Sequence, residues 1–471
     1  MKFFAYASMG ILLLGGCRSI AVPGFQKFHR ADIACAGTSH RNGEMPLRLP
    51  HRTVDDVIGK IDLDLTMLME VAFQNNSEVR RAWLLAQAAA AQKSLAKSSL
   101  FPTVNMAFSL RRDQGKNAVA DGELAQFHQT SLTNPALQLN YAVFTFGANL
   151  ANAQAAQENL SAANFQYNRS LQDLLFAVQR GYFSMSSAMA TMDASGENLR
   201  DATETMKFEE ERLRVGLGDR QTFLQAKASM LQAQCALEMA RADVEARRAA
   251  LAATVGVRIS DGFHISPSKL PLQLEALEGD IQKMISAAIN TRPDLLASYM
   301  RVKAMQCGER ALRRDRLPKV ITTLDGKLGE TRHGHGTSRA MGIFFGLSWD
   351  LFDGFAHSYR IMEQRAQKQA AIEALRSAEL RVMEEIWSQY HAFHGAYHRV
   401  LAAREWVNSA AESFRAMEMS HRSGLSHFID LLNAQNVLAA ARQNLVAAEC
   451  DFSIALATLA HATGSMEPLK Q

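Results

Sequence analysis

The sequence predicts a mainly α-helical chain with a small β part, built from two internal repeats. Three observations lead there: two very long proline-free tracts, four short segments in which apolar residues alternate with polar ones, and motifs that recur at a fixed offset. With 48% hydrophobic and 21% charged residues among 471, the chain is too apolar to be disordered. Ten prolines leave the stretches Pro135–Pro267 and Pro318–Pro468 free of proline between their ends. An interior proline costs a helix roughly 3 kcal/mol, so these stretches allow long helices.

The first residues carry an export signal. Residues 1–16 hold Lys2 and an apolar run from Phe3 to Leu14, and they end on two glycines before Cys17. A run of this length is too short to span a bilayer of ~30 Å, and small residues before a cysteine suit lipoprotein processing. We expect a signal peptide over 1–16, a lipid on Cys17, and a lipidated N-terminal extension over 17–64. An ordinary signal peptide with a chance cysteine is the alternative. Arg18, by resemblance to bacterial lipoprotein sorting, favours the outer membrane.

Charge and cysteine usage narrow the classes of function. The formal net charge of +4 is small and is not concentrated in a basic run, which disfavours nucleic-acid binding. The other cysteines are scattered and form no metal-ligand spacing. Beyond the signal the sequence has no run of 18 or more apolar residues, so we expect any membrane span to be β rather than helical.

Motifs recur in the two halves of the chain. The early matches lie 216 residues apart and the later ones 208 apart, and the shortening falls between Pro318 and Phe352. We therefore expect a first repeat over 65–257, a linker over 258–280, a second repeat over 281–463 and a tail over 464–471. The matched motifs are Ser77-Glu78-Val79 with Pro293-Asp294-Leu295, Leu100-Phe101-Pro102 with Arg316-Leu317-Pro318, Phe144 with Phe352, Tyr182 with Tyr390, Arg214-x-Gly216-Leu217 with Arg422-x-Gly424-Leu425, and Leu224-x-Ala226 with Leu432-x-Ala434.

Each repeat carries two alternating segments, and these predict four strands per chain. The expected strands are 103–112, 135–146, 319–330 and 341–352. Period-two alternation over about 9–11 residues is what a tilted transmembrane strand needs, with apolar side chains outward. Four strands are too few to close a barrel alone. A half-buried strand of a soluble sheet is the alternative.

A very long helix follows the strands of each repeat. The expected helices, Ala148–Arg214 and Ala356–Arg422, are each ~100 Å long at 1.5 Å per residue. Gly216 and Gly424 follow them, where a left-handed cap is needed. The last helix has a coiled-coil seam of 3,4 spacing. The seam consists of Leu438, Ala441, Leu445, Ala448, Phe452, Ala455 and Leu459.

Together these features resemble the outer-membrane efflux protein family of the TolC type, over roughly residues 65–463. The resemblance rests on the start of each half, on Leu351–Gly354 after a strand, on the two tyrosines and on the two Arg-x-Gly-Leu motifs. The first half departs from the family pattern at Val143–Gly147, where Thr-Phe-Gly replaces the usual Asp-Gly. The resemblance implies a homotrimer in which each protomer gives four strands to one closed barrel and its helices to a long periplasmic tunnel.

The same resemblance implies a function. Similar proteins are passive outer-membrane exit ducts of tripartite efflux or secretion systems. They are engaged by a periplasmic adaptor protein and an inner-membrane pump. For this chain we expect a lipid-anchored protein of the outer membrane, in contact with its lipid, that passes small toxic compounds from the periplasm to the exterior. No cofactor is expected.

The resemblance also points to candidate site residues. The adaptor would dock on the two turns, at Arg214, Gly216, Leu217, Arg422, Gly424 and Leu425; the alternative is that these residues only cap helices. Asp430 matches the family's acidic gate ring, and Asn433 stands where a second Asp occurs. Three copies of Asp430 on an axis would attract cations. A solvated surface Asp is the alternative, and the first-repeat counterpart is Thr222.

No catalytic motif is present in the sequence, so we expect no enzyme. His391, His394 and His398 share one helix face, where a metal site is conceivable, but a polar helix face is the favoured interpretation. Two other functions stay open. One is a lipid-anchored periplasmic coiled-coil protein, structural or adaptor-like, with a soluble sheet. The other is the same duct serving type I protein secretion.

Overall fold

The computed structural model describes residues 64–117, 126–257, 280–331 and 336–464. The expected signal peptide, Cys17, nearly all of the N-terminal extension and the linker, and the last residues of the tail lie outside the described residues. Both expected repeats are represented in the four described ranges.

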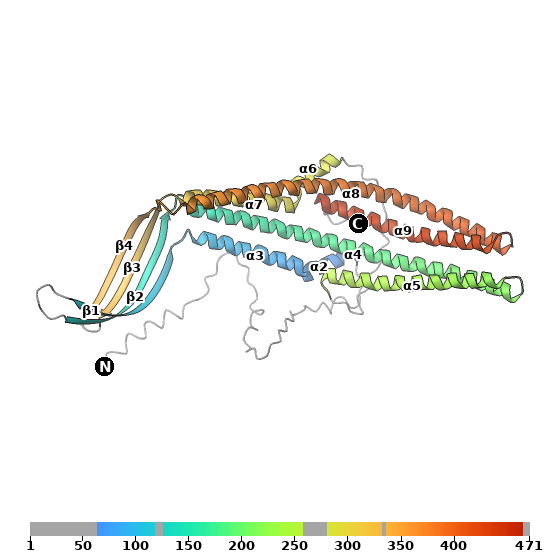
Figure 1. The fold of residues 1–471 in the computed structure, drawn as a ribbon, viewed down its shortest axis with the longest axis horizontal. Helices are drawn as coiled ribbons and strands as arrows, with labels where there is room; N and C mark the ends of the chain where they lie inside the picture. Colours follow the sequence, from blue (N-terminus) through green and yellow to red (C-terminus); the bar gives the residue numbers. More distant parts are fainter. Residues whose placement is uncertain (1–63, 118–125, 258–279, 332–335, 465–471) are drawn as a thin grey trace, which may run out of the picture. The chain divides into compact units, whose positions relative to one another are not determined.

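Four antiparallel strands form one sheet in the order β1-β2-β3-β4 (Figure 1). They span Thr103–Asn117, Gln126–Phe144, Lys319–Thr331 and Gly336–Ser348. Each strand therefore pairs with its neighbour in the chain, although four helices separate β2 from β3 in the sequence.

The strand bounds correct three of the four expected from the sequence. β1 continues past 112 and β2 begins before 135, because Asn117 pairs with Gln126 and backbone ladders need no apolar side chains. Pro135 lies inside β2, and the β2–β3 pairing is interrupted there, between Thr133 and Ala136. Proline lacks the N–H that the ladder requires. β4 covers 336–348 instead of 341–352, because the chain turns toward the next helix after Ser348.

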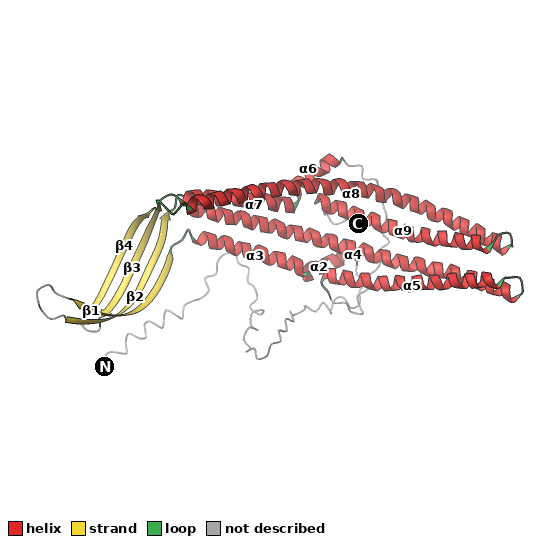
Figure 2. Cartoon of the chain, in the orientation of Figure 1, coloured by secondary structure: helices red, strands yellow, loops and turns green. Residues whose placement is uncertain are grey.

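Eight helices are described alongside this sheet (Figure 2). In the first half they are α2 Leu65–Asn75, α3 Ser77–Ser98, α4 Ala148–Arg214 and α5 Arg220–Val255. In the second half they are α6 Ile281–Thr291, α7 Pro293–Asp315, α8 Ala356–Arg422 and α9 Phe428–Thr463. The long helices α4 and α8 have 67 residues each, and their bounds coincide with those expected from the sequence.

Both long helices begin on a left-handed turn. Phe146 and Gly147 precede α4 with φ of 50° and 79°, and Gly354 and Phe355 precede α8 with φ of 67° and 68°. The turn is therefore present in the first half even though Thr-Phe-Gly replaces Asp-Gly. Phenylalanine in this region costs energy, of order 1–2 kcal/mol.

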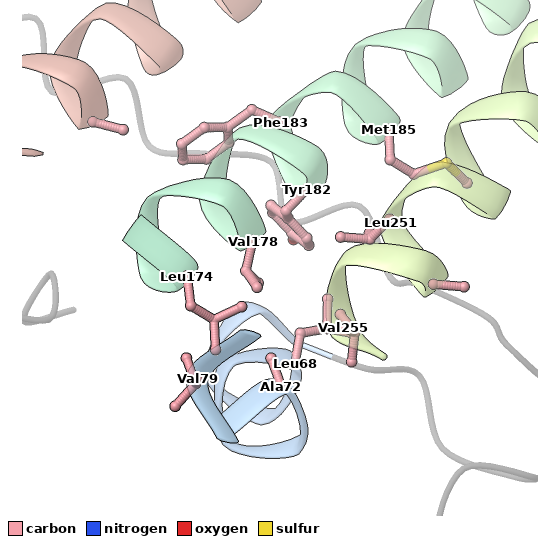
Figure 3. Close-up of a cluster of buried hydrophobic side chains, with 12 residues drawn as sticks. Leu68, Ala72, Val79, Leu174, Val178, Tyr182, Phe183, Met185, Leu251 and Val255 are labelled. Carbon is pink, nitrogen blue, oxygen red and sulfur yellow. The ribbon is translucent and has the colours of Figure 1, made fainter. Parts of the chain in front are cut away.

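The helices pack in a lateral order that follows the order of the strands. α3 packs on α4, α4 on α7 and α7 on α8, while α5 lies along α4 and α9 lies along both α8 and α4. The largest buried cluster joins α2, α3, α4 and α5 around Tyr182, which is 1% exposed (Figure 3). At about 25 cal/mol per Å², such buried apolar side chains are the main source of stability.

Helix α9 carries the predicted seam. Leu438, Ala441, Ala448, Phe452 and Leu459 are buried, and its other two members are partly buried in the same clusters. Within the described residues α9 is the one helix that meets the length and hydropathy of a membrane span. Because its apolar seam packs on α8, we interpret α9 as a helix of the protein core and not as a membrane span.

Candidate functional site

The four-stranded sheet has one apolar face. Cross-strand partners share a face of the sheet, and Val104, Leu139, Leu324 and Ile343 form one row across it. A second row runs through Met106, Leu137, Gly326 and Met341. In the single chain Met341 is 85% exposed, Met106 78% and Leu137 54%, while Leu139 and Leu324 are partly buried. An exposed apolar face of this extent marks contact with lipid or protein.

The opposite face of the sheet is mostly polar. One row consists of Thr103, Asn140, Thr323 and Phe344, with the Thr323 hydroxyl 3.3 Å from the Asn140 Oδ1 atom. The next row consists of Asn105, Gln138 and Asp325, and Lys327 follows one row further along. Apolar and polar faces on one sheet are what strands need when they separate lipid from a water-filled lumen.

Two edges of the sheet are open within the described residues. β1 pairs only with β2, and β4 pairs only with β3. An exposed edge presents unpaired N–H and C=O groups, which cannot be left bare in lipid.

The two predicted turns have the same capping geometry. Leu217 N–H donates to the Arg212 carbonyl and Gly216 N–H to the Leu213 carbonyl, which is the Schellman pattern. In the second turn Leu425 and Gly424 make the equivalent bonds to Ser420 and His421. Gly216 and Gly424 both have φ of 75°, the left-handed conformation that glycine enters freely.

Both turns present an apolar residue to solvent. Leu217 is 75% exposed and Leu425 is 83% exposed. Arg214 and Arg422 are exposed and are each engaged by a glutamate on their own helix, Glu211 and Glu418. The docking candidates thus form two similar exposed turns, and each turn presents one leucine side chain to solvent.

The gate candidates lie on the first turns of α9. Asp430 and Asn433 are exposed in the single chain, on the side of α9 away from the buried Leu431 and Gln435. Such exposure fits both a pore-lining and a surface position. Thr222, the first-repeat counterpart of Asp430, is partly buried at the start of α5.

A buried polar contact near these turns was not predicted from the sequence. The Nε2 atom of His421 lies 2.7 Å from the Oε1 atom of Glu209, and both residues are at least 95% buried. The Nδ1 atom of His421 lies 3.1 Å from the Ser426 carbonyl oxygen. Each ring nitrogen therefore lies within hydrogen-bond distance of an acceptor oxygen. Arg212 lies 3.2 Å from the same ring.

Further polar contacts join α9 to α4 along their length. Arg442 donates to Asn198 at 2.8 Å and to Asp201 at 2.7 Å, and His461 lies 2.8 Å from Asp173. With Glu209–His421, the second-half pair α8/α9 is therefore held on α4 by three carboxylates. The partners lie more than 200 residues apart in sequence, so no local pattern could have revealed them.

The three candidate histidines on α8 contact aromatic rings. Ring centroids are 5.5 Å apart for His391 and Trp387, 4.5 Å for His394 and Tyr390, and 5.3 Å for His398 and Tyr397. Within the part of the chain that the structure describes, no three His, Cys, Asp or Glu side chains gather as a metal site. The metal hypothesis for this stripe therefore has no geometric support.

Comparison with known proteins agrees with this architecture. Residues 68–257 and 284–465 match the family described as outer membrane efflux protein. The chain is 25% identical to protein CyaE of Bordetella pertussis, over 82% of this chain and 80% of that protein. It is also 25% identical to the outer membrane efflux protein BepC of Brucella suis, over 85% of each.

Solved structures show the same fold. The outer-membrane channel OprN superimposes with a TM-score of 0.75 at 21% identity, covering 85% of this chain and 89% of that one. The CmeC outer membrane channel of Campylobacter jejuni gives a TM-score of 0.75 at 16% identity, covering 92% and 96%. The family match spans most of the chain and includes both helical tips and all four strands. The chain is a member of the outer membrane efflux protein family.

Proposed function

We propose that this outer-membrane efflux channel works as a homotrimer in which three copies of β1–β4 close one barrel. The observation that carries the proposal is the sheet itself, with one apolar face, one polar face and two open edges. Closure by neighbouring copies would pair β1 of one protomer with β4 of the next. A closed barrel is the only way in which strands leave no edge in lipid.

The helices would continue this barrel as a tunnel made of two repeats. The start of α3 is tied to the end of α5 by Asn76, whose Nδ2 atom donates to the Thr254 carbonyl at 2.9 Å. The start of α7 is tied to the end of α9 in the same way, by Arg292 and the Ala462 carbonyl at 2.7 Å. Equal lengths of α4 and α8 and equal capping at the two tips support the same duplication.

The two tips would meet the periplasmic adaptor. Exposed Leu217 and Leu425 offer an apolar contact, and Arg214 and Arg422 add charge beside it. Asp430, with Asn433 one turn further, would form the periplasmic gate. Three Asp430 carboxylates around an axis would repel one another and attract cations.

The remaining parts of the proposal concern anchor, partners and cargo. Cys17 would carry the lipid; a relative at 22% identity over 66% of this chain is named a probable outer membrane lipoprotein, SilC of Salmonella typhimurium. An inner-membrane pump would supply the energy. Small toxic compounds are the proposed cargo, in keeping with the family's description as efflux proteins. Type I protein secretion through the same duct is the second candidate.

Single-channel conductance in a planar bilayer tests the duct and the gate together. We expect channels from the purified wild-type protein, and a changed conductance or cation block in Asp430→Ala. Asp219→Ala is the matched control, because Asp219 is an exposed acid at the other tip. Equal behaviour of Asp430→Ala and wild type would remove Asp430 from the gate. A soluble monomer without conductance would instead favour the periplasmic coiled-coil alternative.

A further inference from the structure

The end of α7 next to the sheet is strongly basic. Four arginines and one acid, Asp315, occupy residues 310–316. Arg310, Arg313 and Arg314 are all exposed. Glu309 precedes them, but this buried carboxylate is already shared by Arg313, Arg365 and Lys368. The cluster therefore keeps a net positive charge that no acid of the described residues is shown to balance.

Arg310 and Arg313 lie on the side of α7 that continues the apolar face of the sheet. Arg314 reaches toward the start of α4, where its Nη1 atom donates to the Gly147 carbonyl at 3.4 Å. Cross-strand partners Val320 and Leu347 lie on the apolar face, so Lys319, the next residue, lies on the polar face. Lys319 is paired with Asp315 at 2.6 Å, which places Asp315 on the polar side of α7. At 3.6 residues per turn, Arg310 and Arg313 lie roughly 140° and 160° around the helix from Asp315.

Exposed aromatic residues lie between this basic cluster and the apolar face. Trp349 and Leu351 continue the alternation of β4 and are 55% and 77% exposed. The indole Nε1 of Trp349 donates to the Arg316 carbonyl at 3.2 Å, so the tryptophan is fixed against the end of α7. Phe352 and Phe355 add two more exposed rings. Tryptophan at this boundary is typical of the level of lipid headgroups.

The first half keeps part of this chemistry at the equivalent place. Lys97 is exposed in the last turn of α3, and Phe101 follows it with 66% of its surface exposed. They correspond to Arg313 and Leu317 at the offset of 216, whereas Arg310 and Arg314 correspond to Ser94 and Ser98.

We propose that Arg310, Arg313 and Arg314 bind the phosphate groups of anionic phospholipids in the leaflet where these strand ends emerge. The proposal rests on the proposed membrane barrel. Guanidinium groups match phosphate oxygens in charge and in geometry, and a row of aromatic rings sets the depth of the headgroups beside them. The occupant is an anionic phospholipid such as phosphatidylglycerol, rather than a zwitterionic one.

Quenching of Trp349 by brominated lipids tests this inference. The full mature protein is reconstituted in vesicles that contain either dibromo-phosphatidylglycerol in phosphatidylcholine or dibromo-phosphatidylcholine in phosphatidylglycerol, at equal bromine content. Subtracting the signal of Trp349→Phe isolates Trp349 among the four tryptophans. In the wild-type protein we expect the binding constant of the anionic lipid to exceed that of the zwitterionic lipid. In the variant Arg310→Gln/Arg314→Gln we expect this ratio to fall roughly five-fold for each arginine removed.

The control variant removes the same number of positive charges at a different place. Arg241→Gln/Arg247→Gln removes two exposed arginines from α5, which has no contact with α7 or the sheet among the principal packing contacts, and should keep the wild-type preference. Arg313 is left in place, so Glu309 keeps all its partners. The wild-type preference should also weaken as salt rises. Equal quenching by both lipids, or an unchanged preference in the α7 variant, would overturn the inference. Absence of quenching by either lipid would instead contradict the membrane barrel.

Discussion

At the residue scale, Glu309 illustrates how this helical structure retains a buried charge. Its carboxylate is 5% exposed and receives bonds from Lys368 at 2.7 Å and Arg365 at 3.0 Å, both on α8, and from Arg313 on its own helix. Hydrogen bonds from Lys368, and then from the two arginines, lower the pKa of Glu309 to about 2 despite its burial. The ionised Glu309 carboxylate therefore stabilises the packing of α7 on α8.

We expect Glu309→Gln to lower the free energy of unfolding at pH 7 by on the order of 2–3 kcal/mol, because three cations lose their shared partner. A lowered pKa contributes stability that is complete above the unfolded pKa and is lost as pH falls toward the folded one. The difference between variant and wild type should therefore shrink between about pH 4.5 and about pH 2. Urea unfolding at pH 7 and pH 3 measures it, with exposed Glu363→Gln as the control. Equal destabilisation at both pH values would contradict this account.

The Glu209–His421 contact gives a second prediction at this scale. Replacing His421 by alanine leaves the Glu209 carboxylate buried with only Arg212, at 3.5 Å. Breaking a buried pair on one side costs roughly 3 kcal/mol, so we expect the second tip to open more often. Faster amide exchange at the start of α9 in His421→Ala measures this. In Glu209→Gln/His421→Ala the added cost should be small, and strictly additive effects would show that the two side chains do not act as a pair.

At the scale of elements, the glycines that end helices fall into two kinds. Gly216 and Gly424 have left-handed φ and open space around an added Cβ. Gly256 has φ of 84°, and a Cβ there would lie 2.9 Å from the Asn75 carbonyl oxygen. The tips therefore need glycine for its backbone conformation alone, while the end of α5 also needs it for the close approach of α2.

Alanine substitution should separate these two requirements. We expect Gly216→Ala to cost about 1 kcal/mol, from backbone strain. Gly256→Ala should cost clearly more, because the α2–α3 junction must move as well. Thermal unfolding of the two variants compares them directly. A larger loss in Gly216→Ala would mean that the tip packs more tightly than the structure shows.

The helices and strands also show which structural features could be predicted from sequence patterns alone. Proline-free tracts predicted α4 and α8, and 3,4 spacing predicted the seam of α9, since these signals are local. Alternation located the strands but not their ends, because β1 and β2 pair through polar residues such as Asn117 and Gln126. The ladder depends on backbone groups, which every residue but proline provides.

At the scale of the whole molecule, the proposed barrel and the proposed lipid on Cys17 are two separate attachments to the membrane. A closed barrel inserts through its apolar face and needs no acyl chain, whereas a lipid on Cys17 would hold the chain to the membrane through that one residue. The two can therefore be separated by removing the lipid.

We expect Cys17→Ser, exported through an ordinary signal peptide, to remain in the membrane fraction after an alkaline wash and to run as a trimer. The apolar rows of β1–β4 supply the insertion energy, at about 25 cal/mol per Å². Release of the variant as a soluble monomer would contradict the barrel and support the lipid-anchored coiled-coil alternative. Fractionation followed by gel analysis without heating distinguishes the two.

The sequence by itself determined the two long helices, the approximate positions of the strands, the glycine turns and the family, because these depend on local patterns and on motifs that recur along the chain. Only the tertiary structure decided which side chains from distant segments meet. Glu209 with His421, Asp201 with Arg442 and Glu309 with Lys368 join segments 59 to 241 residues apart. It also decided that Arg310 and Arg313 lie beside the apolar face of the sheet. Such contacts depend on how long helices and strands pack in register, and local periodicity carries no information about that register.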